Sequence, residues 1–356
     1  MSNQAVIDLL ANWLKPLGFD LEIQHVSCEN GKQKSNLIAT TGSGSGGLIL
    51  SGHTDTVPFN ESLWLHDPFK VSEQENRIYG LGSCDMKSFL AMAITASQRF
   101  DLKNLKHPLT IVGSADEETT MLGAKLLADN EKLKGRFCVI GEPTELTPIR
   151  QHKGTLMESI KFIGSSGHSS NPALGNNAME AMIIFIGQLL QYRDQLQRKF
   201  QDTAFEIPQP TLNLGHIHGG DNPNRICGDC ELHIDIRFLP GMELQELRND
   251  ILDIAQEVAE QRALKVECKA LFDGVPAMDT DVNSKLTRYI EEISQKPANS
   301  VAFGTEAPFY NNMSCETIVF GPGSINQAHQ PDEYLQIDQI DLTIKHLEKL
   351  IHRFCE

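Results

Sequence analysis

The sequence predicts an α/β fold with a central mixed sheet and crossover helices, into which a smaller α+β unit is inserted. Two observations carry this prediction. Over residues 1–153, strand-like apolar runs alternate with helical stretches, the order expected of a sheet with crossover helices. Over residues 154–272 the order becomes strand, helix, two strands, helix and strand. That order fits a four-stranded antiparallel sheet with two helices on one face, a split βαβ arrangement.

Apolar periodicity and stop signals place the elements of the first unit. Val6, Leu10 and Leu14 recur at helical spacing, and Gly18 is a helix C-terminal stop. The apolar run 48–50, bracketed by glycine and polar residues, is the end of a buried strand. Further strands are expected over 19–26, 36–40, 109–116 and 137–140, and helices over 87–100 and 118–128.

The later part of the chain divides into the inserted unit and a return to the first. The insert is expected to hold strands 158–163, 211–218, 231–238 and 264–271, and helices 177–199 and 244–262. After it come a helix over 282–293, a strand over 317–320 and a helix over 342–354. We therefore predict a discontinuous first domain of residues 1–153 and 273–356 around an inserted domain of residues 154–272.

The composition is that of a folded globular protein with an acidic balance. The chain has 356 residues, more than one hydrophobic core usually supports, and 40% of them are hydrophobic. No apolar run approaches the length of a membrane span, and the start lacks the features of a signal peptide. A net charge of −16 argues against nucleic acids and anionic membranes as partners, and it is compatible with a cationic small substrate.

The eight cysteines are scattered, which is typical of reduced thiols in the cytoplasm. Cys227 and Cys230 have the spacing of a redox or zinc pair, but no second such pair exists in the sequence. We therefore expect no redox or metal role there. Cys84 precedes a candidate ligand, Asp85, and we interpret it as a small buried thiol.

Candidate metal ligands begin with the stretch LILSGHTDTVP at residues 48–58. His53 and Asp55 follow the buried strand and are two residues apart, so in extended conformation they project from the same side. A histidine that binds a metal usually donates its other ring N–H to a carboxylate. His53 and Asp55 therefore fit a ligand and its orienting partner, although a polar surface turn has the same composition.

Further acids and a histidine occur at similar points of later segments. Because ligands bind at the carboxyl ends of the strands of an open α/β sheet, these residues are expected to converge. Two histidines and four acids suit a pair of divalent ions, zinc first. The additional candidates are Asp85, Glu117, Glu118, Glu142 and His329.

Glu117 and Glu118 are neighbours and cannot share one role on a regular strand. At a strand-to-helix turn, one can face a metal and the other the substrate water. The alternative is an acidic first turn that complements the helix dipole.

Nine segments together resemble a known family of enzymes. The segments are SGHTDTVPF, YGLGSCDMKSF, ADEETTMLGA, IGEPTEL, GHSSNPALGNNAME, LNLGHIHGGDNPNRIC, HIDIRFLPGMEL, TEAPF and GPGSINQAHQPDEYL. They are similar to the co-catalytic zinc amidohydrolases that include acetylornithine deacetylase, succinyl-diaminopimelate desuccinylase, aminoacylase and carboxypeptidase G. The likeness covers nearly the whole chain. It implies a zinc-peptidase-like catalytic domain and an inserted dimerisation or lid domain.

The resemblance implies a role for each candidate ligand. His53 and Glu142 would hold one zinc ion, Glu118 and His329 the other, and Asp85 would bridge them. Asp55 would orient His53, and Glu117 would be the general acid and base. Cobalt could substitute for zinc. The family also has a cis peptide after the bridging aspartate, here between Asp85 and Met86, whereas Ser88 departs from the glycine usual at its position.

Other residues are implied in substrate binding and assembly. His168 resembles a family histidine that reaches the active site of the partner subunit in a homodimer, with a surface or capping histidine as the alternative. Asn224, Arg225 and Arg237 are candidates for the substrate α-carboxylate, because arginine binds carboxylates in a bidentate manner. An ordinary interdomain salt bridge is the alternative for both arginines. Glu306 is our candidate for a substrate ammonium group, with an ordinary loop acid as the alternative. His216 and His218 are interpreted as strand and rim residues.

The expected reaction is zinc-dependent removal of acetyl from N-alpha-acetyl-L-ornithine, giving L-ornithine and acetate for arginine biosynthesis in the cytoplasm. Two alternatives remain open. The same chemistry could act on another N-acyl amino acid, such as acetylcitrulline, acetylmethionine or succinyl-diaminopimelate, or on a dipeptide. A scaffold protein that kept the fold without activity is a different class, and the complete ligand set with Glu117 argues against it.

Overall fold

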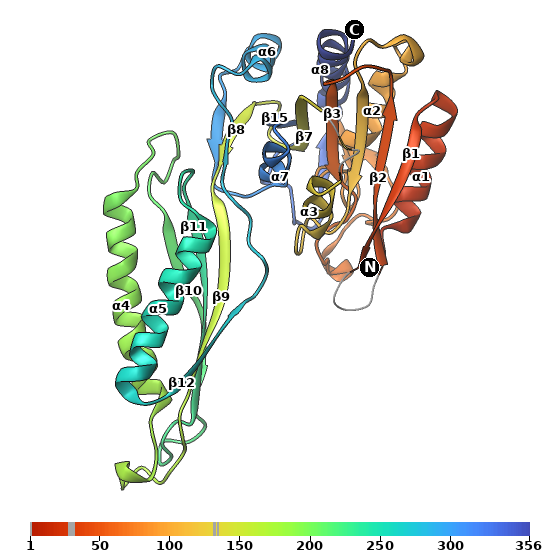
Figure 1. Cartoon of the computed structure of the whole chain (residues 1–356). Helices are drawn as coiled ribbons and strands as arrows, with labels where there is room; N and C mark the ends of the chain where they lie inside the picture. Colours follow the sequence, from red (N-terminus) through yellow and green to blue (C-terminus); the bar gives the residue numbers. More distant parts are fainter. Residues whose placement is uncertain (1, 28–32, 131–132, 134) are drawn as a thin grey trace. The chain divides into compact units, whose positions relative to one another are not determined.

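The computed structural model describes residues 2–27, 33–130, 133 and 135–356 (Figure 1). The chain forms two compact units. Unit 1 contains residues 1–150, 279–299 and 305–356, and unit 2 contains residues 151–278 and 300–304. Residues 151–153, 273–278 and 300–304 were predicted to lie in the first domain, and the contacts place them in unit 2.

Unit 1 is built on a mixed sheet whose central strands are parallel. Its strands run in the order β1-β2-β6-β3-β7-β15, extended by β8 and β13, with β14 paired to β8. β3 is parallel to β6 and β7, and β7 is parallel to β15, whereas β1, β2 and β6 pair antiparallel. The strands are β1 (Asp20–Ser27), β2 (Gln33–Thr41), β3 (Leu48–His53), β6 (Leu109–Ser114), β7 (Phe137–Pro143), β8 (Ile149–His152), β13 (Met278–Asp279), β14 (Asn299–Val301) and β15 (Glu316–Gly321).

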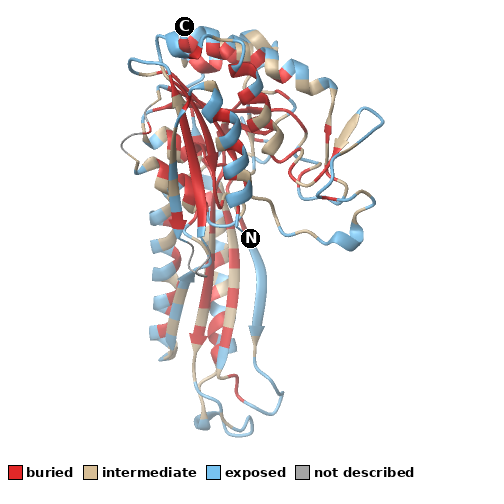
Figure 2. Cartoon of the chain, turned by 90° about the vertical axis from the view of Figure 1, so that its right-hand side faces the viewer, coloured by how far each residue is buried: buried red, intermediate tan, exposed pale blue. Residues whose placement is uncertain are grey.

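Helices cover the sheet of unit 1. Every residue of β3, β6 and β7 is buried, which explains their continuous apolar runs, because both faces of a parallel sheet are covered (Figure 2). Ile7, Phe89 and Leu350 belong to its core and come from three different helices. The helices are α1 (Gln4–Leu14), α2 (Lys87–Ser97), α3 (Leu122–Ala128), α6 (Lys285–Ser294), α7 (Ala307–Asn312) and α8 (Asp338–Cys355).

A small second sheet in unit 1 was not predicted. It has the order β16-β5-β4, with β4 (Ser72–Gln74), β5 (Arg77–Tyr79) and β16 (Tyr334–Gln336). Tyr79 lies opposite Tyr334 in this antiparallel pairing. The pairing holds the segment after β5 beside the segment before β16, and each of these segments carries a candidate metal ligand.

Unit 2 is a four-stranded antiparallel sheet with two long helices, as predicted. The order is β10-β11-β9-β12, so that β10 and β12 are edge strands. Buried residues alternate with more exposed ones along β11. The buried residues of β11 belong to one hydrophobic core with residues of both helices. The elements are β9 (Gly154–Ile163), α4 (Ala178–Lys199), β10 (Thr211–Gly219), β11 (Asp229–Phe238), α5 (Leu244–Arg262) and β12 (Lys265–Ala270).

The predicted helix over 118–128 is wrong at its start. Helix α3 begins only at Leu122, and Met121 before it has a left-handed backbone with φ of 54°. The hydroxyl groups of Thr119 and Thr120 donate to the carboxylate of Asp116, which holds residues 116–120 in a turn. Ser and Thr side chains compete for local hydrogen bonds in this way. The two adjacent glutamates therefore lie in a turn and not in the first turn of a helix.

The peptide bond between Asp85 and Met86 is cis. Among the described residues, we find no helix with the length and apolar character needed to span a membrane.

Candidate metal centre

The candidate ligands gather at the carboxyl ends of neighbouring parallel strands. His53 is the last residue of β3, Glu142 lies in β7, and Glu118 follows the end of β6. These three strands are adjacent and parallel, so their carboxyl ends meet at one edge of the sheet. Asp85 and His329 come from the two segments beside β5 and β16. The fold thus brings all five residues to one place.

The carboxylate of Asp85 lies between the two histidines. Asp85 Oδ1 is 2.8 Å from His53 Nε2, and Asp85 Oδ2 is 3.5 Å from His329 Nε2. Glu118 Oε2 is 3.1 Å from His329 Nε2, and Glu142 Oε1 is 3.9 Å from His53 Nε2. Each histidine therefore has one glutamate beside it, and both share Asp85. Two cation sites joined by one carboxylate have this arrangement.

The electrostatics of this cluster fit a divalent cation. Burial, with the charge of Asp85, raises the pKa of Glu142 well above its ordinary value, and Glu142 Oε1 has no hydrogen-bond partner among the described residues. Burial disfavours the ionised form of Asp85, but contacts with His329 and His53 lower its pKa. An unpartnered carboxylate oxygen beside histidine nitrogens is a donor set that suits zinc. The residues present therefore fit a metal ion.

Glu117 lies in the same cluster as the ligands. One group of possible ligands contains His53, Glu117 and Glu142, another contains His53, Asp85 and Glu118, and the ligand atoms within each group lie within 4.8 Å of one another. Burial raises the pKa of Glu117 well above its ordinary value. A carboxyl group that readily holds a proton beside a metal site can transfer protons.

Asp55 contacts His53 through its main chain. His53 Nδ1 is 3.1 Å from the carbonyl oxygen of Asp55 and 3.7 Å from its Oδ1. Asp55 Oδ1 instead accepts a hydrogen bond of 3.2 Å from the backbone N–H of Glu117, and its Oδ2 is 3.7 Å from Lys34 Nζ. The contact with His53 that we expected from the carboxylate is therefore made by the carbonyl group. Nothing in the sequence pattern marked Lys34 as a neighbour of this cluster.

The comparisons with known proteins decide the family. A family model described as peptidase family M20/M25/M40 matches residues 49–353. The chain belongs to this family. The acetylornithine deacetylase of Edwardsiella ictaluri (strain 93-146) is 49% identical over 355 residues, covering 100% of this chain and 92% of that protein. The acetylornithine deacetylase of Klebsiella pneumoniae (strain 342) is 46% identical over 354 residues, covering 99% of this chain and 92% of that protein.

Solved structures share the fold of this M20 family member. A tripeptidase from Staphylococcus aureus aligns with a TM-score of 0.76 at 20% identity, covering 98% of this chain and 92% of that one. Aminopeptidase PepT from Bacillus cereus aligns with a TM-score of 0.78 at 17% identity, covering 97% of this chain and 91% of that one. The resemblance and the fold class predicted from the sequence are therefore confirmed.

Glu306 is buried in this M20 family member. It is 1% exposed and precedes helix α7, and its Oε1 accepts a hydrogen bond from the hydroxyl of Ser51 in β3. The hydroxyl of Ser51 also lies 2.7 Å from the hydroxyl oxygen of Tyr310. Burial raises the pKa of this carboxyl group, and the hydroxyl groups of Ser114 and Ser51 beside it act in the opposite direction.

Unit 2 brings His168, Asn224 and Arg225 together. His168 and Arg225 form an isolated antiparallel bridge, and the N–H of Ser169 donates to the carbonyl oxygen of Asn224 at 3.0 Å. The guanidinium of Arg225 forms an ion pair with Asp221. These three candidates lie on two adjoining segments, 167–169 and 222–225.

Arg237 is engaged with neighbours on its own sheet. Its Nε is 2.9 Å from Asp235 Oδ1, and its Nη1 donates to Thr155 Oγ1 at 3.0 Å. These contacts lie within unit 2, whereas the predicted alternative was a salt bridge between the two domains.

The cysteine pair does not form a metal group with the described residues. The thiol of Cys227 donates to the carbonyl oxygen of Asp229, and burial raises the pKa of Cys230 to about 11. Neither belongs to a described set of three possible ligands. Burial also raises the pKa of Cys84 to about 12, so its thiol stays protonated near neutral pH.

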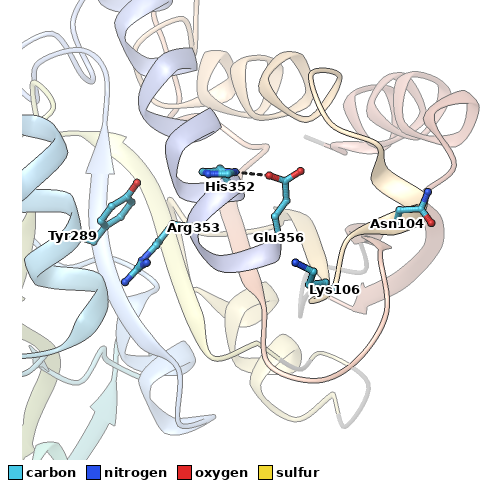
Figure 3. Close-up of a pocket in the computed structure, with 6 residues that line it drawn as sticks. All are labelled: Asn104, Lys106, Tyr289, His352, Arg353 and Glu356. Atoms are coloured by element: carbon cyan, nitrogen blue, oxygen red, sulfur yellow. Dashed lines mark hydrogen bonds and ion pairs between the residues drawn. The ribbon is translucent and has the colours of Figure 1, made fainter.

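Unit 1 also has a cavity of about 730 Å³, which lies away from the candidate metal ligands. Figure 3 shows its lining around the end of α8, where His352 interacts with Glu356 and Arg353 lies near Tyr289. Lys106, which also lines it, precedes β6, whereas the candidate ligands follow the other end of that strand. This cavity is therefore separate from the metal centre.

Proposed function

We propose that this protein is a metal-dependent hydrolase that removes the acetyl group from N-alpha-acetyl-L-ornithine, the reaction that yields ornithine for arginine biosynthesis. The observation that carries the proposal is the Asp85 carboxylate between His53 and His329, with one further glutamate beside each histidine. Relatives named acetylornithine deacetylase, 46–49% identical along the chain, support the choice of substrate.

His53 and Glu142 would hold one metal ion, and Glu118 and His329 the other, with Asp85 shared. We propose zinc, with cobalt as a substitute, because the donors are histidine nitrogens and carboxylate oxygens. When bound, such ions activate water and polarise a carbonyl group. Asp55 supports this set by accepting from His53 through its carbonyl oxygen.

Glu117 would carry the proton. Amide hydrolysis adds hydroxyl to the acyl carbon and a proton to the departing nitrogen as the C–N bond breaks. Glu117 would take the proton from the attacking water and deliver it to the amine, a contribution of roughly 100- to 10,000-fold. Its burial and raised pKa support this role, since a carboxyl group that retains a proton can return it. The hydrogen bond from its N–H to Asp55 fixes the turn on which it lies.

Substrate recognition would involve residues other than the metal ligands. We propose that Arg225, Arg237 and Asn224 recognise the α-carboxylate, and that His168 stabilises the oxyanion in the site of a partner subunit. Glu306 is proposed for the side-chain ammonium, because a buried carboxylate can accept a charge-assisted hydrogen bond from that group. The seven described cysteines are unpaired, which supports a role in the reducing cytoplasm.

A side-by-side assay tests the substrate. Purified zinc-loaded protein is given acetylornithine, acetylcitrulline, acetylmethionine and succinyl-diaminopimelate, and kcat/KM is measured for each. We expect acetylornithine to have the highest value. A higher value for another substrate would replace acetylornithine in the proposal, and loaded protein without any hydrolysis would indicate a scaffold.

Removal of the metal tests the chemistry. Dialysis against a chelator should abolish hydrolysis, and added zinc or cobalt should restore it, because the carboxylates alone cannot activate water near neutral pH. Full activity of protein shown by elemental analysis to be free of metal would contradict the proposal.

A further inference from the structure

The segment that carries Asp85 is held by one buried side chain. Glu333 is 3% exposed, and its Oε1 accepts hydrogen bonds of 2.8 Å from the N–H of Cys84 and 2.9 Å from the N–H of Asp85. Its Oε2 accepts a hydrogen bond of 2.8 Å from the N–H of Gly82. Three backbone donors of residues 82–85 thus point at a single carboxylate.

The backbone of Glu333 binds the same segment. Its carbonyl oxygen accepts from the N–H of Gly80 at 3.1 Å and from the hydroxyl of Ser83 at 3.4 Å. Glu333 directly precedes β16 and Gly80 directly follows β5, so the first of these bonds continues the pairing of the two strands. The strand pairing therefore sets the position of Glu333, and its carboxylate is then directed at the turn.

The turn requires an anion at this place. Successive backbone N–H groups that converge in a turn form a concave site that favours negative charge. Each buried N–H left without an acceptor would destabilise the turn, because its hydrogen bond to water would not be replaced. Gly82, whose φ is 77°, allows the turn to close around the carboxylate. Glu333 supplies the charge that the turn binds.

Glu333 also connects two ligands of the proposed metal centre. It lies four residues after His329, and it holds the N–H of Asp85 itself. The Oδ2 of Asp85 lies 3.5 Å from His329 Nε2. A change in the distance between these two segments would therefore change the distance between Asp85, the shared ligand, and His329.

We propose that Glu333 is a positioning residue that fixes Asp85 relative to His329, and so sets the affinity of the protein for its metal ions. The inference rests on the proposed metal centre. Glu333 acts through Asp85. Outer residues that orient metal ligands typically change metal affinity by 10- to 100-fold when they are replaced.

The preceding residue offers a matched control. Asp332 Oδ1 accepts from the N–H groups of Leu65 and His66, both at 2.9 Å, and lies 3.0 Å from His66 Nδ1. It therefore binds a neighbouring loop in the same way, but that loop carries none of the proposed ligands. Loss of the Asp332 contacts should affect loop stability without affecting the position of Asp85.

The test compares Glu333→Gln with Asp332→Asn in the full chain. Zinc affinity is measured by competition with a chelator, thermal unfolding is measured for the metal-free proteins, and the absorption spectrum of the cobalt-loaded proteins is recorded. Glu333→Gln should bind zinc 10- to 100-fold more weakly than wild type and change the cobalt spectrum. Asp332→Asn should bind zinc within about twofold of wild type, because its contacts lie on the other loop.

A second variant separates charge from folding. Glu333→Ala leaves the turn without an anion, and sodium formate should restore part of its zinc affinity, whereas sodium chloride of equal ionic strength should not. Wild-type zinc affinity in both Glu333 variants would overturn the inference, as would an equal loss of affinity in Asp332→Asn. Wild-type protein that binds no divalent metal would instead overturn the proposed function.

Discussion

At the scale of single residues, the adjacent acids Glu117 and Glu118 have different surroundings. Glu118 Oε2 lies 3.1 Å from His329 Nε2, whereas Glu117 is grouped with His53 and Glu142. Both glutamates lie in the turn between two left-handed residues, Asp116 and Met121. Their chemical difference follows from the backbone and not from the side chains, which are identical.

Replacement of each acid by its amide should separate the two roles. Glu117→Gln should lower kcat by roughly 100- to 10,000-fold with metal content close to wild type, because only the proposed proton carrier would be lost. Glu118→Gln should lower the occupancy of one metal site, measured by elemental analysis after gel filtration. Equal metal loss in the two variants would show that the roles are assigned wrongly.

Glu306→Gln tests recognition of the side-chain ammonium. A hydrogen bond to a charged group contributes roughly 1.5–3 kcal/mol, so KM for acetylornithine should rise about 10-fold or more. KM for acetylmethionine, which has no ammonium group, is the control and should change little. An equal change for both substrates would show that Glu306 stabilises the structure around Ser51 and does not recognise the ammonium group.

His152 should make stability depend on pH. It is fully buried, and burial lowers its pKa to about 4. The unfolded chain therefore binds a proton at His152 more readily than the folded chain does. The stability that neutral, buried His152 contributes is present above about pH 6.5 and is lost as the pH falls towards 4. Between pH 7.5 and 5.5, metal-free wild type should lose about 1 kcal/mol of unfolding free energy more than His152→Gln does.

Denaturant unfolding of both proteins at the two pH values measures this difference. The same loss in both proteins would show that His152 does not titrate with folding.

At the scale of elements, the sequence predicted the long helices and the buried strands. The apolar run before His53 and the spacing of Val6, Leu10 and Leu14 are strong patterns, and the structure contains β3 and α1 there. The three-residue strands β4, β5 and β16 were missed because so few residues show no periodicity. Consequently the role of Glu333 was missed, since it depends on the pairing of β5 with β16.

Close packing of β7 against α2 gives a prediction for Gly141. A Cβ added to Gly141 would lie 2.0 Å from the ring of Phe89, so Gly141→Ala should destabilise by about 1–3 kcal/mol. Gly187 in α4 is the control, because a Cβ there has no neighbour within 4 Å among the described residues. Gly187→Ala should stabilise by roughly 0.5–1 kcal/mol, the helix preference for alanine. Thermal unfolding measures both, and equal effects would contradict this description of the packing.

At the scale of the whole molecule, unit 2 presents surfaces suited to self-association. Ile183 on α4 is 65% exposed, and Ile217 on the edge strand β10 is 55% exposed. Exposed apolar groups on an edge strand and helix favour contact with another chain, and most homo-oligomers are two-fold dimers. The proposed role of His168 in a partner's site agrees with such a dimer.

Complementation tests the shared site. His168→Ala and Glu117→Ala should each be nearly inactive alone. Co-folded in equal amounts, about half of the dimers are mixed, and one site in each mixed dimer has both residues intact, so activity should recover to roughly a quarter of wild type. A mixture that stays inactive would show that His168 acts within its own chain.

The shared carboxylate would also make the two proposed metal sites depend on each other. Asp85 Oδ1 faces His53 and Asp85 Oδ2 faces His329, so an ion held at one site would take up negative charge that an ion at the other site would use. Two doubly charged ions beside one carboxylate also repel each other. The proposed sites should therefore fill in two separate steps as the metal concentration rises. By reciprocity, whatever factor the first ion imposes on the second, the second imposes on the first.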